Sequence, residues 1–168
     1  MGFQKSVGLM PAIGLPGQEV NPGQAVYTAF NYVSDGTVQA GTFAFPVALT
    51  EGGDQVMNTA TFKGKAGDTP LGFVARNFIA AITNPLDEST QTFNKGLGLS
   101  IAIRGQFYMT ATGEATEGQQ ILIDPATGKV TYGALEETDT RIETGWVVRL
   151  PRGVFEVDEG DLIIAERF

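Results

Sequence analysis

Carboxylates are the side chains of this sequence with the greatest capacity for chemistry. Glu156, Asp158, Glu159 and Asp161 lie close together in the chain, and hard cations such as Ca²⁺ prefer clustered carboxylate oxygens. Their spacing is not that of a calcium-binding loop, and acidic turns are usually just solvated. A glycosidase needs two carboxylates about 5–10 Å apart in a cleft, but nothing marks such a pair among the 19 acidic residues. We therefore predict no metal site. A cation bound by residues 156–161 is the alternative that the sequence leaves open.

The other common catalytic groups are missing. The sequence contains no histidine and no cysteine, which removes Ser-His-Asp and Cys-His nucleophiles, the usual zinc sites and any disulfide framework. Residues 64–69 (Gly-Lys-Ala-Gly-Asp-Thr) superficially resemble a phosphate-binding loop. They lack the P-loop spacing and the strand-loop-helix context that such a loop needs. We therefore predict a protein that is not an enzyme, with no catalytic residues and no cofactor.

The charge balance narrows the possible partners. The 11 basic and 19 acidic residues give a net charge of −8. A chain of that sign gains nothing from neutralising phosphates, so we expect neither nucleic acid nor an anionic membrane as a partner. The longest apolar stretches fall far short of the roughly 18 residues that a membrane span needs. The N-terminus lacks the apolar segment and cleavage site of a signal peptide, so we expect the protein to be made and kept in the cytoplasm.

Any site must be positioned by β-strands, because the hydrophobic pattern has a period of two. Between residues 97 and 109 the odd positions are all apolar or glycine, whereas the even positions are mostly small or polar. This alternation predicts a long strand with one buried and one wetted face. Ile101→Asp should therefore unfold the protein, while Ala102→Asp should be mild. Gly105 is the expected place for a bulge, a bend or a corner where the strand passes between sheets.

The sequence pattern of the rest of the chain predicts short strands separated by frequent turns. Glycine, at 22 of 168 residues, is about twice its usual share, which suits turns and bulges. The pattern indicates an all-β fold, a β-sandwich or barrel of jelly-roll type, forming a single β domain over residues 25–168. Strands are expected at residues 25–33, 38–49, 97–112, 119–123, 129–132, 145–150 and 161–165.

Turn residues divide these strands. Asp35-Gly36 suits a two-residue type I′ hairpin turn. Pro125 restricts φ in a second turn, and Gly128 can take a left-handed conformation where the chain re-enters the sheet. Residues 50–72 are expected to be irregular, and residues 76–83 hold at most one short helix.

Residues 1–24 differ from the rest of the chain. Pro11, Pro16 and Pro22, together with several glycines, exclude a helix and disfavour a central strand. The apolar side chains between them are too many for a solvated linker. We predict an extended N-terminal arm whose side chains dock on a surface, either on its own domain or on a neighbouring subunit.

Several stretches, taken in order, resemble one protein family. They are residues 1–4 (Met-Gly-Phe-Gln), 21–22 (Asn-Pro), 72–76 (Gly-Phe-Val-Ala-Arg), 104–109 (Arg-Gly-Gln-Phe-Tyr-Met) and 118–131, with Asp-Pro-Ala-Thr-Gly in the last. In this order and spacing they resemble the structural cement, or head decoration, proteins of tailed bacteriophages. The resemblance covers most of the chain.

The resemblance implies a β-rich virion protein that binds the outside of the mature phage head. It would bridge neighbouring major capsid subunits and reinforce the shell against the pressure of the packaged DNA. It would form a small homo-oligomer, with a homodimer favoured over a trimer. It would be made in the host cytoplasm. The arm and the 72–76 motif hold the residues that we expect to contact the capsid or a neighbouring subunit. These residues are Phe3, Leu9, Pro11, Leu15, Pro22, Phe73 and Arg76.

A second interpretation is a carbohydrate-binding β-sandwich of a phage tail fibre or a minor tail protein. Exposed aromatic rings with polar neighbours can stack on sugars, and Tyr27, Tyr32 or Trp146 would be the candidates. In a chain with period-two patterning, such rings more often fill the core. Binding to glycans would favour this interpretation, whereas co-purification with empty shells would favour a cement protein.

Overall fold

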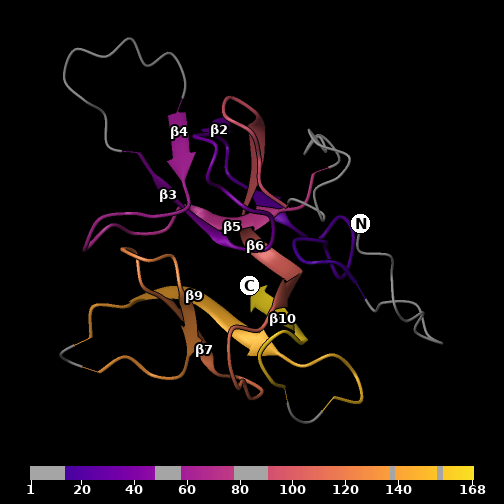
Figure 1. Ribbon diagram of the computed structural model, residues 1–168. Coiled ribbons are helices and arrows are strands. Elements are labelled where there is room, and N and C mark those ends of the chain that lie inside the picture. The colour runs from indigo at the N-terminus through magenta and orange to yellow at the C-terminus, as the bar shows by residue number, and fades with distance from the viewer. Residues whose placement is uncertain (1–13, 48–57, 78–90, 137–138, 155–156) are drawn as a thin grey trace, which may run out of the picture.

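The computed structural model describes residues 14–47, 58–77, 91–136, 139–154 and 157–168. Every regular element in these ranges is a β-strand, which confirms the all-β prediction (Figure 1). The strands are β1 (Val26–Tyr27), β2 (Tyr32–Ser34), β3 (Phe43–Pro46), β4 (Asn58–Thr61), β5 (Gly72–Ala75), β6 (Gly98–Thr110), β7 (Gln120–Ile123), β8 (Val130–Tyr132), β9 (Ile142–Arg149) and β10 (Leu162–Arg167).

The longest strand, β6, joins the two halves of the molecule. Its residues 98–104 pair with β1, β2 and β5, whereas residues 105–110 pair with β10. The change of partner falls at Gly105, whose φ of +133° favours glycine. A Cβ there would also lie 3.1 Å from atoms of Ala25. The predicted corner is therefore confirmed, because the strand leaves one sheet at Gly105 and enters another (Figure 1).

The first half of the molecule is a small closed barrel. β2 pairs in parallel with β4, β4 pairs with β3, β3 with β5 and β5 with β6, and β6 returns to β2. This closure removes most of the free edges that a short open sheet would expose. The interior is filled by buried side chains, most of them small or aliphatic: Val38, Ala40, Ala44, Ala60, Val74, Phe93, Leu99 and Ile101.

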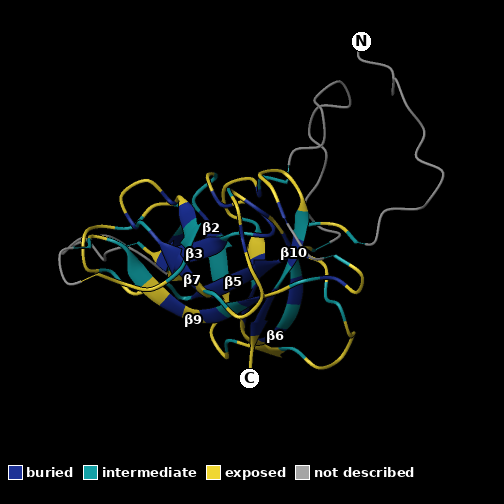
Figure 2. Ribbon diagram, turned by 90° about the horizontal axis from the view of Figure 1, so that it is seen from below, coloured by how far each residue is buried: buried dark blue, intermediate teal, exposed yellow. Residues whose placement is uncertain are grey.

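The second half is an antiparallel sheet in the order β6–β10–β9–β7–β8, which lies below the barrel in Figure 1. The main hydrophobic core lies between this sheet and the outer face of the barrel. At its centre Trp146 of β9 is fully buried. The Trp146 ring centroid lies 5.5–6.2 Å from those of Phe43, Phe73 and Phe107. Figure 2 shows the buried residues along the strands and the exposed ones in the loops around them.

The wetted face predicted for residues 97–109 is only partly wet. Ala102 is fully buried, because the second sheet covers the outer face of the barrel at this point. Conversely Ile103, at a position predicted to be buried, is 37% exposed. The prediction that Ala102→Asp would be mild assumed a wet face at this position, and that assumption is wrong. A jelly roll also keeps its strands in two separate sheets, whereas β6 here belongs to both halves.

The N-terminal strands pair differently from the prediction. The single strand expected at residues 25–33 is divided into β1 and β2. Asp35-Gly36 does not join a hairpin, because β2 pairs with β4 and β6 rather than with β3. The chain still bends there, and the Asp35 carboxylate accepts a hydrogen bond from the backbone N–H of Thr37 at 2.8 Å. β4 lies within residues 50–72, which were expected to be irregular.

The C-terminal strands follow the prediction closely. β7 and β8 form the expected hairpin, and the N–H of Gly128 donates to the carbonyl of Asp124 at 2.7 Å. Gly128 has the predicted positive φ, at +72°. β9 and β10 occupy the regions of the strands expected at 145–150 and 161–165. The short helix considered at 76–83 falls mainly outside the described residues.

Candidate interaction surface

The described part of the N-terminal arm lies along β6 of its own chain. The N–H of Gly17 donates to the carbonyl of Tyr108 at 2.7 Å, and the N–H of Tyr108 donates to the carbonyl of Gln18 at 2.9 Å. A further bond joins Val20 to the same strand. Of the two arrangements predicted for the arm, contact with its own domain is the one that these residues adopt. Residues 1–13 lie outside the described ranges.

Gly17 holds the arm against the end of β5. Its carbonyl accepts a hydrogen bond from the N–H of Arg76 at 2.7 Å. A Cβ on Gly17 would lie 2.8 Å from the backbone nitrogen of Arg76 and 2.9 Å from that of Gly41. Its φ of +82° also disfavours any other residue. The close approach brings Leu15 near Arg76, two of the residues predicted to make contacts.

Leu15 and Arg76 line one hollow, of about 400 Å³, which we call the arm hollow. It lies where the arm meets β1 and β5. Leu15 and Tyr27 form apolar parts of its wall and are 48% and 40% exposed. The hollow therefore offers apolar surface to solvent beside a cationic side chain. Its lining residues are Leu15, Gly17, Gln18, Glu19, Tyr27, Ala75 and Arg76.

Inside the arm hollow the carboxylate of Glu19 is fully engaged. Its two oxygens accept hydrogen bonds from the Tyr27 hydroxyl at 2.5 Å and from the backbone N–H of Gly23 at 3.0 Å. Burial of the phenol, with the hydrogen bond and the negative charge of Glu19, raises the pKa of Tyr27, so its hydroxyl remains a donor. Among the described residues, no acceptor pairs with the guanidinium of Arg76. Arg76 and Glu19 are the two charged residues of the hollow, and neither forms an ion pair with a described residue.

Exposed apolar side chains gather around β1. Val26 is 48% exposed, Phe30 65% and Ile103 37%. Val26 lies opposite Arg104 of β6 in the strand register, which places Ile103 beside β1. Apolar groups that gather at a protein surface often mark an interaction site. We define the β1 surface as Leu15, Val26, Tyr27, Phe30, Arg76 and Ile103.

The remaining predicted contact residues lie elsewhere. Phe73 is fully buried in the main core, and its ring centroid lies 5.4 Å from that of Phe43. Its side chain therefore presents no contact surface, and the assignment is corrected. Pro22 is exposed in a turn near the end of the arm. The residues outside the described ranges are Phe3, Leu9 and Pro11.

Sequence reasoning missed three members of the β1 surface. Val26 and Phe30 were assigned to one continuous strand, in which apolar residues are expected to be half buried. The chain instead leaves the sheet between β1 and β2, so Phe30 lies outside any strand, and Val26 is exposed although it belongs to β1. Ile103 was assigned to the buried face of β6 by its period-two position. No local signal in the sequence marks either departure.

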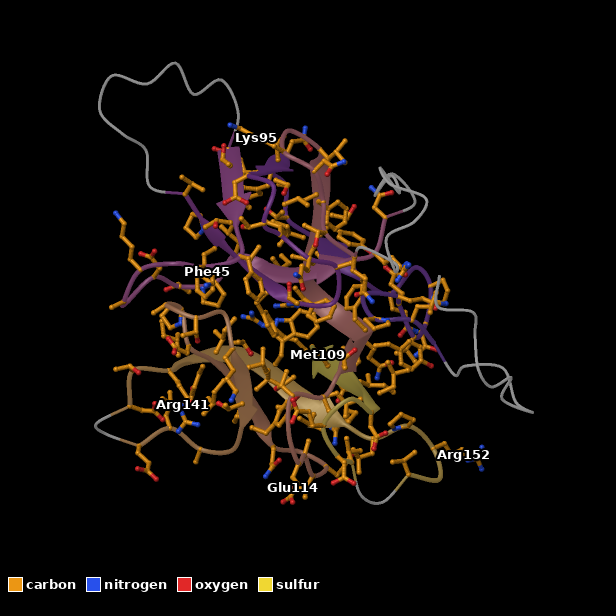
Figure 3. The ribbon with its side chains drawn as sticks, in the orientation of Figure 1. Phe45, Lys95, Met109, Glu114, Arg141 and Arg152 are labelled. Carbon is orange, nitrogen blue, oxygen red and sulfur yellow. The ribbon has the colours of Figure 1, made fainter. Side chains whose placement is uncertain are left out.

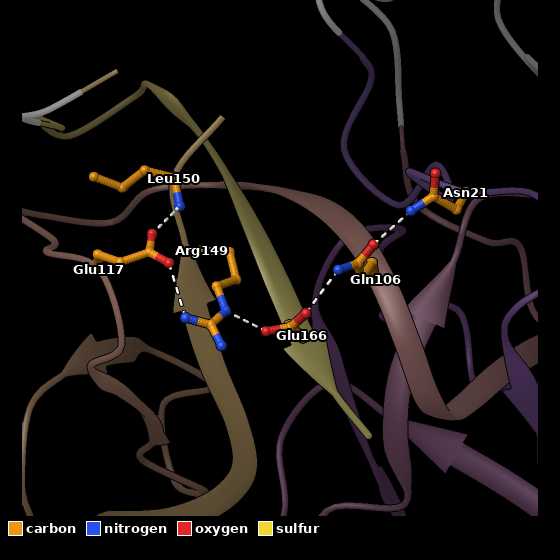
Figure 4. Close-up of polar contacts among 6 residues, drawn as sticks. All are labelled: Asn21, Gln106, Glu117, Arg149, Leu150 and Glu166. Carbon is orange, nitrogen blue, oxygen red and sulfur yellow. Dashed lines mark hydrogen bonds and ion pairs between the residues drawn. The ribbon is translucent and has the colours of Figure 1, made fainter. Parts of the chain in front are cut away.

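A chain of polar contacts ties the arm to the second sheet (Figure 4). Asn21 Nδ2 donates to Gln106 Oε1 at 2.7 Å, and Gln106 Nε2 donates to Glu166 Oε1 at 2.6 Å. The guanidinium of Arg149 pairs with the other oxygen of Glu166, whose side chain is buried. Both oxygens of this carboxylate are thus satisfied, as burial of a charge requires. The network joins the arm, β6, β10 and β9.

Glu117 ends this network at the surface and contributes to stability in a pH-dependent way. Burial acts to raise its pKa, but hydrogen bonds from the Leu150 N–H at 2.6 Å and from Arg149 at 2.9 Å lower it below the ordinary 4.5. The stabilisation is therefore complete above about pH 4.5 and is lost as the pH falls through the lowered folded-state pKa. Because both side chains are about half exposed, we expect Glu117→Gln to cost at most about 1 kcal/mol at pH 7.

Urea titrations at pH 7 and pH 3 measure this difference. Glu114→Gln is the matched control, since Glu114 is exposed at the lower edge of the molecule and forms no ion pair with a described residue (Figure 3). The cost of Glu117→Gln should largely disappear at pH 3. An equal cost for both variants at pH 7 would show that the Arg149 contact contributes nothing.

The described residues also provide evidence on a metal site, a membrane span and the aromatic rings considered for sugar binding. Among them, no group of three or more His, Cys, Asp or Glu side chains lies close enough together to hold a metal ion. No helix in the same ranges is long and apolar enough to cross a membrane. Trp146, one of the rings considered for sugar stacking, is fully buried, and Tyr32 is half-buried on β2. The carbohydrate-binding interpretation therefore loses Trp146, its largest candidate ring.

Comparisons with known proteins give the chain a family. The model of the family described as "Structural cement protein (E217 gp24/Pam3 gp6)" matches residues 3–166. No curated protein matches the chain significantly. Among solved structures, a chain of "The capsid of Myoviridae Phage XM1" matches with a TM-score of 0.64 at 11% identity, over 99% of this chain and 97% of that one. This second likeness shows a shared fold, and the family match over nearly the whole chain shows that the protein belongs to the structural cement proteins of bacteriophages.

Proposed function

We propose that this protein binds the outer surface of the assembled phage head, bridges neighbouring major capsid subunits and stabilises the shell against the pressure of the packaged DNA. The observation that carries this proposal is the family match over residues 3–166. The net charge of −8 supports a position away from the packaged nucleic acid, because like charges repel. A clamp of this kind needs no catalysis and no cofactor.

The capsid contact is proposed at the β1 surface. Val26 and Phe30 are exposed there, whereas most large apolar side chains of the described residues are buried. The arm residues Phe3, Leu9 and Pro11, with Pro22, are proposed as further contacts with the capsid or a neighbouring copy. Phe73 is left out of this set because its side chain lies in the core.

The free protein is proposed to be a homodimer, with a trimer as the alternative, made in the host cytoplasm before it joins the virion. Two linked copies can each hold a part of the shell. The second contact then forms at a high effective concentration, so that each single contact can be weak. Neither nucleic acid nor a membrane is a partner in this proposal, in keeping with the charge of the chain.

Binding to assembled shells and to free capsid subunits tests the proposal. We expect the protein to co-sediment with expanded empty shells of its phage and not to bind dissociated capsid subunits, because a bridging site exists only where neighbours meet. Mixtures are sedimented through sucrose and the bound protein is quantified on gels. Shells already saturated with the protein are the control for free sites. Equal binding to free subunits would contradict bridging, and no binding to shells would overturn the cement function.

A further inference from the structure

We propose that the arm hollow and the free edge of β1 bind an extended segment of the shell protein, which supplies a carboxylate to Arg76 and an aliphatic side chain to the hollow. This inference rests on the proposed function, since it names the chemistry by which the shell would be recognised. An unpaired cation, an apolar hollow and a free strand edge lie together at this place, and each favours the same occupant.

Arg76 is a guanidinium without a partner in an acidic chain. The net charge is −8, and no carboxylate of the described residues pairs with Arg76. Other exposed arginines of the described residues also lack an ion pair, but Arg76 is the one that lines the hollow. Glu19, the carboxylate of the same hollow, accepts hydrogen bonds from two neutral groups and forms no ion pair with Arg76. Arginine presents a planar fork of N–H groups that matches a carboxylate. Arg76 is therefore a docking point for an acidic group of another molecule.

The hollow beside Arg76 has the size and lining of a side-chain pocket. Its volume is about 400 Å³, and Leu15, Tyr27 and Ala75 contribute apolar surface to it. Leu15 and Tyr27 remain 48% and 40% exposed. An incoming aliphatic group would remove this surface from water, which is favourable. The hollow therefore selects an apolar side chain next to the carboxylate that Arg76 binds.

β1 offers main-chain groups next to the hollow. The N–H of Thr28 donates to the carbonyl of Ile101 at 2.9 Å, so Thr28 faces β6. By the alternation of an antiparallel ladder, the N–H and carbonyl of Tyr27 point to the opposite edge. No strand among the described residues pairs with β1 on that edge. An extended peptide can add to such an edge, with main-chain bonds for affinity and pockets for specificity.

The occupant is a segment of the shell protein rather than the arm of a second copy. Residues 1–13 contain no acidic residue, so this part of another copy's arm cannot supply a carboxylate to Arg76. Val26 and Phe30, which lie close to Tyr27 in the sequence, are further exposed apolar side chains. Under the proposed function, the shell protein lies against this face in every bound copy.

Charge reversal at Arg76 tests the inference in the full chain. Arg76→Glu is compared with the wild type and with Lys95→Glu and Arg152→Glu. These controls make the same change of charge at exposed positions near the two ends of the molecule in Figure 3, and neither residue lines the hollow. Binding to purified expanded shells that lack the protein is measured by co-sedimentation. We expect Arg76→Glu to weaken binding about tenfold or more, while the two controls bind like the wild type.

Each outcome decides between the two proposals. If the wild type binds shells and Arg76→Glu binds equally well, the recognition chemistry is wrong while the cement function stands. If the wild type does not bind shells, both proposals fail. Equal weakening by all three charge reversals would indicate general electrostatic attraction and would overturn a specific role for Arg76. A lower sedimentation coefficient of free Arg76→Glu would make a second copy the occupant, which also overturns the inference.

A second variant keeps the test decisive if Arg76→Glu does not fold. Circular dichroism melts show whether each variant retains the β fold. Leu15→Asp places a carboxylate in the apolar part of the hollow, at a side chain that is half exposed, so the fold should tolerate it. We expect it to weaken shell binding about tenfold as well, because it repels the incoming carboxylate and spoils the apolar contact. Unchanged shell binding by folded Leu15→Asp would contradict the inference.

Discussion

Replacing Ala102 by aspartate is expected to destabilise the protein as severely as replacing Ile101, its neighbour on β6. Both side chains are fully buried, Ile101 inside the barrel and Ala102 between the barrel and the second sheet. Both clusters consist of hydrophobic residues, so the new carboxylate would be buried without a partner. Such burial costs several kcal/mol, a large share of the roughly 5–15 kcal/mol that stabilises a typical protein. We expect Ala102→Asp to lose the cooperative thermal transition in circular dichroism.

Thr110→Asp is the matched control for this result. Thr110 is the last residue of β6 and is exposed, so the same new charge should change stability by no more than about 0.5 kcal/mol. Ile101→Asp is the reference for full disruption. A mild effect of Ala102→Asp would mean that the second sheet does not cover the barrel in solution, and the shared-strand architecture would need revision.

Truncation of Phe73 is expected to cost about 3–5 kcal/mol of folding free energy, the usual range for Phe→Ala in a core. Its ring is fully buried and lies 5.4 Å from Phe43, 5.2 Å from Phe107 and 5.5 Å from Trp146, centroid to centroid. Phe73→Ala would therefore leave a cavity between the barrel and the second sheet. Urea denaturation followed by Trp146 fluorescence measures the loss, because the indole lies beside that cavity.

Leu15→Ala is the companion substitution to Phe73→Ala. Leu15 is 48% exposed, so its truncation should change stability by about 0.5 kcal/mol or less. The two variants thus separate a core residue from a surface residue, although the sequence selected both as contacts. A Phe73→Ala protein that kept its stability but lost shell binding would restore Phe73 as a contact residue.

The β7–β8 hairpin of the C-terminal half could be predicted because its pairing is local. β7 and β8 are joined by a turn in which Pro125 and Gly128 restrict the backbone, so neighbours in the sequence are also neighbours in the sheet. The extent of β6 followed from its period-two pattern. Its corner followed from Gly105, since a long strand bends most easily where no Cβ is present.

The N-terminal half could not be predicted in the same way, because its pairing depends on distant segments. β2 lies between β4 and β6 in the barrel, so the local hairpin at residues 35–36 gives way to a longer-range arrangement. Period-two patterning also cannot tell whether a small residue such as Ala102 faces water or a second sheet. The strands that cover Ala102 are made from residues 120–167.

The candidate site was predicted in part. Leu15 and Arg76 were selected because an apolar arm needs a docking surface and because the 72–76 motif resembles that of a family. Phe73 belongs to the same motif but serves the core, and sequence alone does not separate the two roles. Val26 and Phe30 are exposed although the sequence pattern places both in one strand, because β1 ends after two residues and Phe30 lies outside it.

The sharing of β6 determines when the protein can fold during its synthesis. When residues 1–97 have left the ribosome, β3 can pair with β4 and β5, but β1, β2 and β5 still lack β6 as a partner. The second sheet must wait longer, because residues 105–110 pair with β10 near the far end of the sequence. The main core therefore closes only after residues 162–167 have emerged. Until then the nascent chain carries unpaired apolar strands, and such strands favour aggregation.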